Sequence, residues 1–251
     1  MKRFIWTLSL LVFLGAGLSK AQTYKIFKGD TINRIDKKGM RQGVWKKYYP
    51  TDTLFSVCTF KDGKRVDVYK TYHKTGKLQS EVSYRGKSEV GDAVFYFEGG
   101  GVMARGKYIG QERDSIWNIY EESGRLQAVE SYSKGKKDGL FKDFYPNGQV
   151  SRSMTFKMNK KSGPFTEYFE TGKTKMEAIL IEDDFVGKLT VYHPNGKVWQ
   201  TGQYKDGLRQ GSWFTYDDTG KLESEEKYKN GRVLNPKTEG EPDTPLPNQE
   251  K

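Results

Sequence analysis

The chain has one cysteine and only two histidines among its 251 residues. Cys58 cannot form a disulfide within the chain, and on the inward face of a strand a free cysteine behaves as a small apolar residue. A catalytic thiol needs a positioned base. His73 and His193 occupy the same column of a repeat, five units and roughly 50 Å apart by strand spacing, so they cannot share a metal ion. The sequence therefore predicts no catalytic residue, no metal site and no cofactor.

Helical periodicity is also missing. After residue 21 no segment repeats apolar residues at i, i+3, i+4 and i+7, and 28 glycines argue against long helices. Residues 4–18 form one apolar run, which follows Lys2 and Arg3 and precedes small residues up to Ala21. This pattern is typical of a secretory signal peptide and is short for a membrane span. We expect a signal peptide over residues 1–21 and an exported protein that is periplasmic, envelope-associated or secreted.

Acidic residues are too few to balance the charge. Residues 1–21 hold three of the 43 basic residues and no acid, so the remainder carries 40 Lys and Arg against 32 Asp and Glu, a net charge of +8. A basic balance can indicate nucleic acid, an anionic membrane or an acidic glycan, and export argues against nucleic acid. Lysines on turns and strand edges also oppose aggregation. The expected partner is another protein, with an anionic envelope glycan or lipid as the alternative.

Aromatic residues, in contrast, are abundant and regularly spaced. One recurs every 24 positions without a slip, which is the signature of a repeat architecture. We call these residues the tyrosine column: Tyr48, Tyr72, Tyr96, Tyr120, Phe144, Tyr168, Tyr192 and Tyr216.

A second set of bulky residues lies three positions before the tyrosine column. We call it the tryptophan column, and Ala93 is its weak member. Turn residues, mostly glycine, lie five positions before and four positions after the tyrosine column. The unit reads roughly G-x-W-x-x-Y-x-x-x-G-x-L-x-x-x-x-x-Y-x-x-G. The tryptophan column comprises Trp45, Tyr69, Ala93, Trp117, Phe141, Phe165, Leu189 and Trp213.

Each unit consists of two short runs of aromatic and β-branched residues separated by turn residues, which predicts a β-hairpin. Asn147-Gly148 is among the strongest turns, because both residues tolerate positive φ. In the second run Leu54, Ser56, Cys58 and Phe60 should share one packed face. Trp45 and Tyr48 differ by an odd number, and strong curvature, a bulge or aromatics on both faces would explain this.

One hairpin cannot stand alone, so neighbouring units must stack. The predicted fold is all-β: an elongated, open repeat of about eight stacked antiparallel β-hairpins. Residues 22–41 form a degenerate N-terminal cap repeat, and residues 42–231 hold the eight units. The proline-rich residues 232–251 are expected to be a disordered tail.

The unit resembles the MORN-type repeat, in the bacterial variant of the YwqK antitoxin family. Residues 139–148 (GLFKDFYPNG) and 211–220 (GSWFTYDDTG) carry the likeness, and residues 204–211 (YKDGLRQG) form the bridge between units. The resemblance covers residues 42–231. It implies stacked β-hairpins and a role in interaction or assembly. The resemblance also implies an antitoxin function. The expected export of the chain argues against neutralisation of a toxin in the cytosol.

The repeat assigns nearly every glycine and aromatic residue to architecture. Stacked aromatics favour a core over a ligand platform. The sequence therefore predicts a non-enzymatic, exported surface for protein interaction or scaffolding at the cell envelope. The alternatives are a binding module for anionic glycan or lipid and an extracytoplasmic immunity protein. Unit three departs from the pattern at Ala93, and unit seven departs from it at residues 182–185. The sequence names neither a specific partner nor an oligomeric state.

Overall fold

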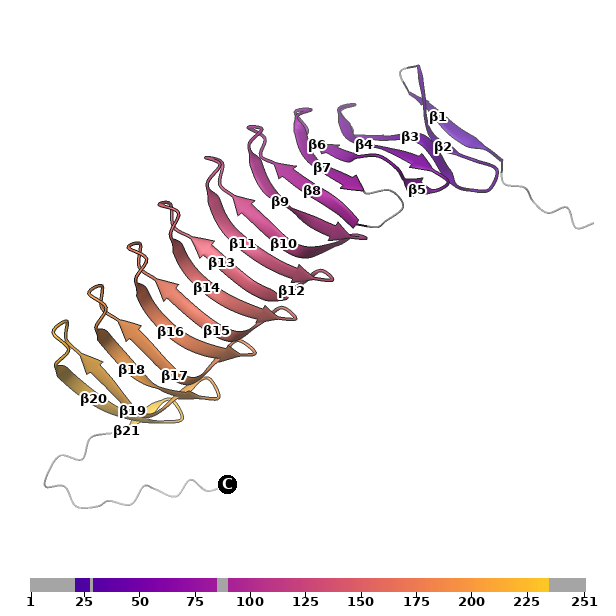
Figure 1. Ribbon diagram of the computed structural model, residues 1–251. Helices are drawn as coiled ribbons and strands as arrows, with labels where there is room; N and C mark the ends of the chain where they lie inside the picture. The colour runs from indigo at the N-terminus through magenta and orange to yellow at the C-terminus, as the bar shows by residue number, and fades with distance from the viewer. Residues whose placement is uncertain (1–20, 28, 85–89, 235–251) are drawn as a thin grey trace, which may run out of the picture.

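The computed structural model describes residues 21–27, 29–84 and 90–234. The predicted signal peptide, apart from Ala21, lies outside this range, as do residues 235–251. The described chain is an elongated, arched array of antiparallel strands (Figure 1), which confirms the predicted all-β hairpin repeat. The strands are β1 Thr23–Phe27, β2 Asp30–Ile35, β3 Arg41–Tyr48, β4 Leu54–Lys61, β5 Lys64–Arg65, β6 Tyr69–Tyr72, β7 Leu78–Tyr84, β8 Val90–Tyr96, β9 Val102–Ile109, β10 Glu112–Tyr120, β11 Leu126–Ser133, β12 Lys136–Lys137, β13 Gly139–Phe144, β14 Val150–Lys157, β15 Lys160–Tyr168, β16 Thr174–Ile181, β17 Asp184–Tyr192, β18 Val198–Lys205, β19 Leu208–Tyr216, β20 Leu222–Lys229 and β21 Arg232–Leu234.

Strands pair with their neighbours in sequence, so each unit adds one hairpin to the sheet. In unit one, β3 pairs with β4 from Gly43 opposite Phe60 to Tyr48 opposite Leu54. The same pairing recurs 168 residues later between β19 and β20. β5 and β6 together form one interrupted strand beside β4, and β12 and β13 do the same beside β11.

A β-bulge accompanies the tyrosine column in all eight units. Lys47 lies opposite Ser56 and Tyr48 opposite Leu54, so Phe55 is an extra residue on the second strand. The equivalent shift occurs in each later hairpin. Of the explanations left open for the odd spacing of Trp45 and Tyr48, a bulge is the one that the structure contains.

The two turns of a unit differ in geometry. The second turn has positive φ at both central residues, as in Asp62-Gly63 with φ of 50° and 77°, which is the type I′ hairpin turn. In the first turn only the glycine has positive φ, for example Gly148 at 86°. The expectation that Asn147 also has positive φ is wrong. Its side-chain oxygen instead accepts a hydrogen bond from the Gln149 amide at 2.9 Å.

Backbone hydrogen bonds join each second turn to the start of the strand that follows the previous second turn. The Gly63 amide donates to Arg41 O at 3.0 Å, and the Gly231 amide donates to Arg209 O at 3.0 Å. The turn formed by Glu182 and Asp183 makes the same contact, since the Asp183 amide donates to Lys161 O at 2.9 Å. Successive second turns are thus held together along one edge of the array, in addition to the pairing of the strands.

The core lies along one face of the curved sheet. Ser56, Cys58 and Phe60 are buried as predicted, whereas Leu54, at the bulge, is half-buried. The tryptophan column supplies the most deeply buried rings, and Trp117 and Trp213 are 0% and 1% exposed. All eight rings of the tyrosine column are half-buried, so the tryptophan column contributes more of the core.

Within the described range, the strand at each end of the array pairs with one neighbouring strand. β1 pairs with β2, and the ring of Phe27 lies 4.1 Å from that of Tyr48. At the other end β21 pairs with β20. The predicted tail therefore begins later than residue 232, because residues 232–234 form a strand. Among the described residues, no helix has the length and apolar character needed to span a membrane.

Candidate functional site

A regular unit encloses its buried ring on all sides. The Trp117 ring lies over Gly106 of the preceding hairpin, where an added Cβ would lie 2.3 Å from Trp117 Cδ2. Its edges meet the rings of Tyr108 and Phe95 at 5.2 and 5.9 Å. Its Nε1 donates to Lys107 O at 3.2 Å. The glycine thus makes room for the ring, and the ring fills that space completely.

A cation closes the outer side of the ring. The guanidinium of Arg113 lies 4.4 Å from the Trp117 centroid and 5.5 Å from that of Tyr132. This is cation–π geometry. Arg41, Arg65, Lys137 and Arg209 are placed in the same way over the rings of their own units.

The sequence analysis missed this basic column. The signal was present, because Arg or Lys recurs four positions before the tryptophan column in six of the eight units. The residues are Arg41, Arg65, Arg113, Lys137, Lys161 and Arg209.

Unit three lacks the enclosed ring. Its tryptophan-column residue is Ala93, and β8 pairs with β7 without a register shift. In the hairpins that carry Trp117, Phe165, Leu189 and Trp213, a second bulge precedes the column residue. Unit three thus has neither the second bulge nor the ring, and an open space lies beside the buried pair Val82 and Ala93.

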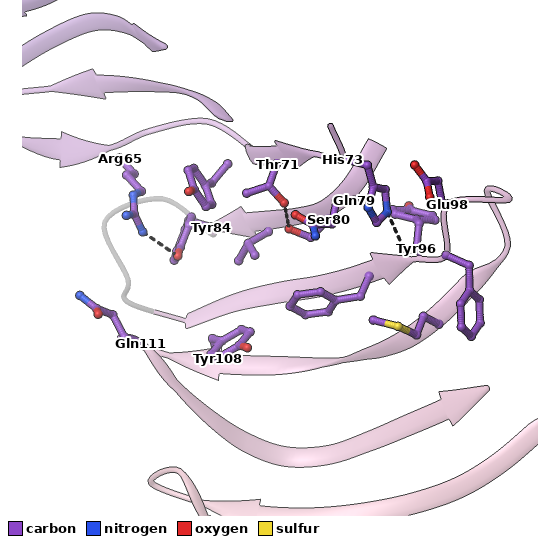
Figure 2. A pocket seen from close by; sticks show the side chains of 16 residues that line it. Arg65, Thr71, His73, Gln79, Ser80, Tyr84, Tyr96, Glu98, Tyr108 and Gln111 are labelled. Atoms are coloured by element: carbon purple, nitrogen blue, oxygen red, sulfur yellow. Dashed lines mark hydrogen bonds between the residues drawn. The ribbon is translucent and has the colours of Figure 1, made fainter. Parts of the chain in front are cut away.

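That space is a groove of about 690 Å³, which we call the unit-three groove (Figure 2). Its apolar lining is mainly aromatic, and its polar lining comes from both ends of the strands. The apolar residues include Tyr69, Val82, Tyr84, Phe95, Phe97 and Tyr108, and the polar ones include Arg65, Thr71, His73, Gln79, Ser80, Glu98 and Gln111.

Hydrogen bonds fix the polar groups of the groove. Arg65 Nη1 donates to the Tyr84 hydroxyl at 3.0 Å, and the hydroxyls of Thr71 and Ser80 lie 2.6 Å apart on the floor. Figure 2 shows both contacts together with the rings of the lining. A rigid aromatic wall with fixed polar groups suits binding rather than proton transfer.

Two pKa values are shifted near this part of the sheet. Burial, together with the hydrogen bond from its hydroxyl to Glu81 at 2.8 Å, raises the pKa of Tyr96 to about 12. Burial also raises the pKa of the Cys58 thiol, although Arg65 and Arg41 oppose the shift. Both groups are therefore neutral at neutral pH, and neither is activated as a nucleophile.

The two histidines connect units. His73 Nε2 lies 3.2 Å from Tyr96 O, and His193 Nε2 lies 2.9 Å from Tyr216 O. The hydroxyl of Tyr145 makes the same contact with Tyr168 O. Both histidines are half-buried.

The acidic residues of unit seven form an ordinary turn. Glu182 and Asp183 have φ of 52° and 77°, as in the other second turns. Lys160 Nζ donates a hydrogen bond to the Glu182 carboxylate at 2.8 Å, and this bond holds the pKa of Glu182 below its usual value. The described residues contain no group of three His, Cys, Asp or Glu that could hold a metal ion.

Five segments of the chain match the family model of the MORN repeat variant: residues 41–62, 68–85, 137–158, 185–206 and 209–230. This is a MORN-type repeat protein. Each matched segment coincides with one hairpin of the array, and the match includes units one, two, five, seven and eight but not units three, four and six. MORN-type repeats indicate a repeat-based binding or scaffold protein.

No curated protein matches the chain. Among solved structures, similar chains occur in "Crystal Structure of TcdB2-TccC3-TEV" and in a Photorhabdus luminescens Tc holotoxin pore, each at 12% identity. Their TM-scores are 0.21 and 0.19, and the match covers 83% of this chain and 14% of each of those chains. The chain thus spans about one seventh of their length.

Proposed function

We propose that this MORN-type protein is an exported, non-enzymatic scaffold at the cell envelope that binds another protein through the unit-three groove. One observation carries the proposal: an open, aromatic-lined groove lies at the unit whose tryptophan-column residue is Ala93. The rings of Tyr69, Tyr84, Phe95 and Tyr108 line this groove, whereas in the next unit Trp117 is buried. Concave surfaces rich in tyrosine and arginine are typical of the centres of protein interfaces.

The basic residues favour a protein partner over an anionic glycan or lipid. Arg41, Arg65, Arg113, Lys137 and Arg209 are stacked over aromatic rings rather than free to form a phosphate-binding patch. Arg65, the cation that lines the groove, also donates to a tyrosine hydroxyl. The groove offers rings and hydrogen-bonding groups, with one basic residue, Arg65, and one acidic residue, Glu98, and this mixture fits a polypeptide better than an anion.

Crosslinking in native envelopes tests the proposal. The wild-type chain should crosslink to a partner protein, and Ala93→Phe should abolish that crosslink because phenylalanine is the residue of this column in units five and six. Gln127→Ala, an exposed change in unit four, is the matched control and should retain the partner. A chain recovered without any partner would contradict the scaffold, and salt-sensitive retention on protein-free envelope lipid would favour the anionic ligand.

A further inference from the structure

Trp199 is a large ring that the core does not use. It is 46% exposed, whereas Trp117 and Trp213 are buried. Its ring contacts only one described aromatic residue, His193, at 6.2 Å between centroids. An exposed tryptophan on an otherwise polar strand edge is the type of residue that anchors protein interfaces.

Trp199 and the unit-three groove open to the same face of the sheet. In β18 Trp199 is the extra residue of the bulge, since Val191 lies opposite Gln200 and Tyr192 opposite Val198. In the 24-residue register it is equivalent to Gln79 and Met103. Both of these residues line the groove, so ring and groove lie at the same edge of the same face.

The walls of the groove carry the same kind of ring that contacts a buried tryptophan elsewhere. Trp117 lies against the rings of Tyr108 and Phe95. Tyr108 and Phe95 also line the groove, and so does Tyr84, the equivalent of Tyr108 one unit earlier. Because Val82 stands where Gly106 lies beneath Trp117, and packs opposite Ala93, an incoming ring would meet these aromatic walls rather than enter a core position.

The two features cannot meet within one chain. Ten strand spacings separate β7 from β18, counting β12 and β13 as one interrupted strand, which places them about 48 Å apart. A tryptophan side chain is far shorter than this distance. The ring that occupies the groove must come from another molecule, and a second copy of this chain carries one at the matching edge.

We infer that two copies form an antiparallel dimer in which Trp199 of each inserts into the unit-three groove of the other. A two-fold axis parallel to the strands and near unit five places unit seven of one copy opposite unit three of its partner. Such an isologous contact closes on itself and does not propagate into filaments. The inference rests on the proposed binding role of the groove and names its occupant.

Charge supports this pairing. The axis keeps the first turns of both copies along the same edge, so the turn with Lys197 faces the turn with Glu98. Both side chains belong to exposed residues of the first turn. Lys197 Nζ reaches Thr219 O at 2.6 Å, and Glu98 Oε1 accepts the Thr75 hydroxyl at 2.7 Å. The two-fold axis creates this pair of Lys197 and Glu98 twice, once at each end of the interface. These opposite charges favour the antiparallel dimer over a parallel arrangement of the two copies.

Sedimentation equilibrium of the purified chain over a range of concentrations tests the dimer. Wild type should dimerise, and both Trp199→Ala and Ala93→Phe should weaken the dimer at least about thirtyfold, as loss of a central aromatic anchor does. Gln127→Ala occupies the same bulge position in unit four and should leave the dissociation constant unchanged. Trp199→Ala removes an exposed side chain, so its effect does not depend on repacking of the core.

A mixing experiment separates reciprocal insertion from general stickiness. The Ala93→Phe chain keeps the ring and lacks the groove, and the Trp199→Ala chain keeps the groove and lacks the ring. Each should be monomeric alone, and their mixture should form a heterodimer with one intact contact. A wild-type monomer, a dimer insensitive to both variants, or a mixture that stays monomeric would overturn the inference.

The outcomes also distinguish this inference from the proposed function. A wild-type monomer that still captures an envelope partner, in a manner abolished by Ala93→Phe, would reject the second copy as occupant and retain the groove as a binding site. A partner captured equally by wild type and Ala93→Phe, without dimerisation, would reject both.

Discussion

Gly202→Ala tests whether buried tryptophans require glycine beneath them. A Cβ at this position would lie 2.2 Å from Trp213 Cδ2 and 2.3 Å from Cε2. Ordinary contacts begin near 3.4 Å, so the ring must move by more than 1 Å. Trp213 is 1% exposed and is enclosed by Tyr204, Tyr228 and Arg209.

The expected loss follows from the contacts that the ring would break. Overpacking of a filled core costs about 1–3 kcal/mol. Displacement of the ring also weakens the hydrogen bond from Trp213 Nε1 to Gln203 O at 3.3 Å, which contributes about 1 kcal/mol. We expect Gly202→Ala to lower the free energy of unfolding by about 3 kcal/mol, measured by urea denaturation followed by circular dichroism.

A matched glycine and a double-mutant cycle make the test specific. An added Cβ at Gly99 would come no closer than 3.5 Å to its nearest neighbour, the Glu122 side chain. Gly99→Ala should therefore change stability by less than about 0.5 kcal/mol. Trp213→Ala alone should cost about 3–5 kcal/mol, and in its presence Gly202→Ala should be neutral. If Gly202→Ala costs the same with and without Trp213, the proposed steric cause is refuted.

Three further results are expected from urea unfolding. Trp117→Ala should lower the free energy of unfolding by about 3–5 kcal/mol. Trp199→Ala should lower it by about 0.5 kcal/mol or less at concentrations where the chain is monomeric. Equal losses would contradict the assignment of Trp117 to the core and of Trp199 to the surface. His73→Ala should cost about 1 kcal/mol through its lost bond to a backbone carbonyl, and added Zn²⁺ should not shift wild-type unfolding; a zinc-dependent shift would reveal a site. Because the pKa of Tyr96 is raised to about 12 in the folded chain, from about 10 when unfolded, its stabilising effect is complete below pH 10 and is lost as pH rises through 12. Tyr96→Phe should therefore lose less stability than wild type over that interval, and identical losses would exclude this tyrosine as a cause.

The 24-residue period was sufficient to predict the hairpins and their stacking. Turn residues recur at fixed positions, and only stacked hairpins can bury such regularly spaced rings. The depth of burial was harder to predict. The tyrosine column is the most regular feature of the sequence, yet its rings are only half-buried. The residues of the tryptophan column vary more in size, yet they are more deeply buried. A large ring such as Trp117 can be buried because the residue beneath it on the neighbouring strand, Gly106, has no side chain.

The groove could be predicted only in part. Ala93 is visible in the sequence as a weak column member, and small residues in a bulky column suggest a cavity. The missing second bulge is not visible, because Gly91 would tolerate either backbone geometry and does not have the positive φ of Gly43 or Gly211. The lining also combines residues from several strands, and their convergence depends on the register.

Unit seven shows why a departure from the pattern does not by itself indicate function. Phe185 replaces the cation of its unit, and its ring lies 6.1 Å from Phe165 and 5.3 Å from Tyr204. The replacement thus fills the position of the basic column with another core ring, and the acidic turn before it keeps the usual geometry. In unit three Val82 packs opposite Ala93, but the aromatic lining of the groove beside them stays open. Since an unfilled apolar space lowers stability, a departure that leaves such a space calls for an occupant, whereas one that is repacked does not. This difference is the reason for proposing the binding site at unit three rather than at unit seven.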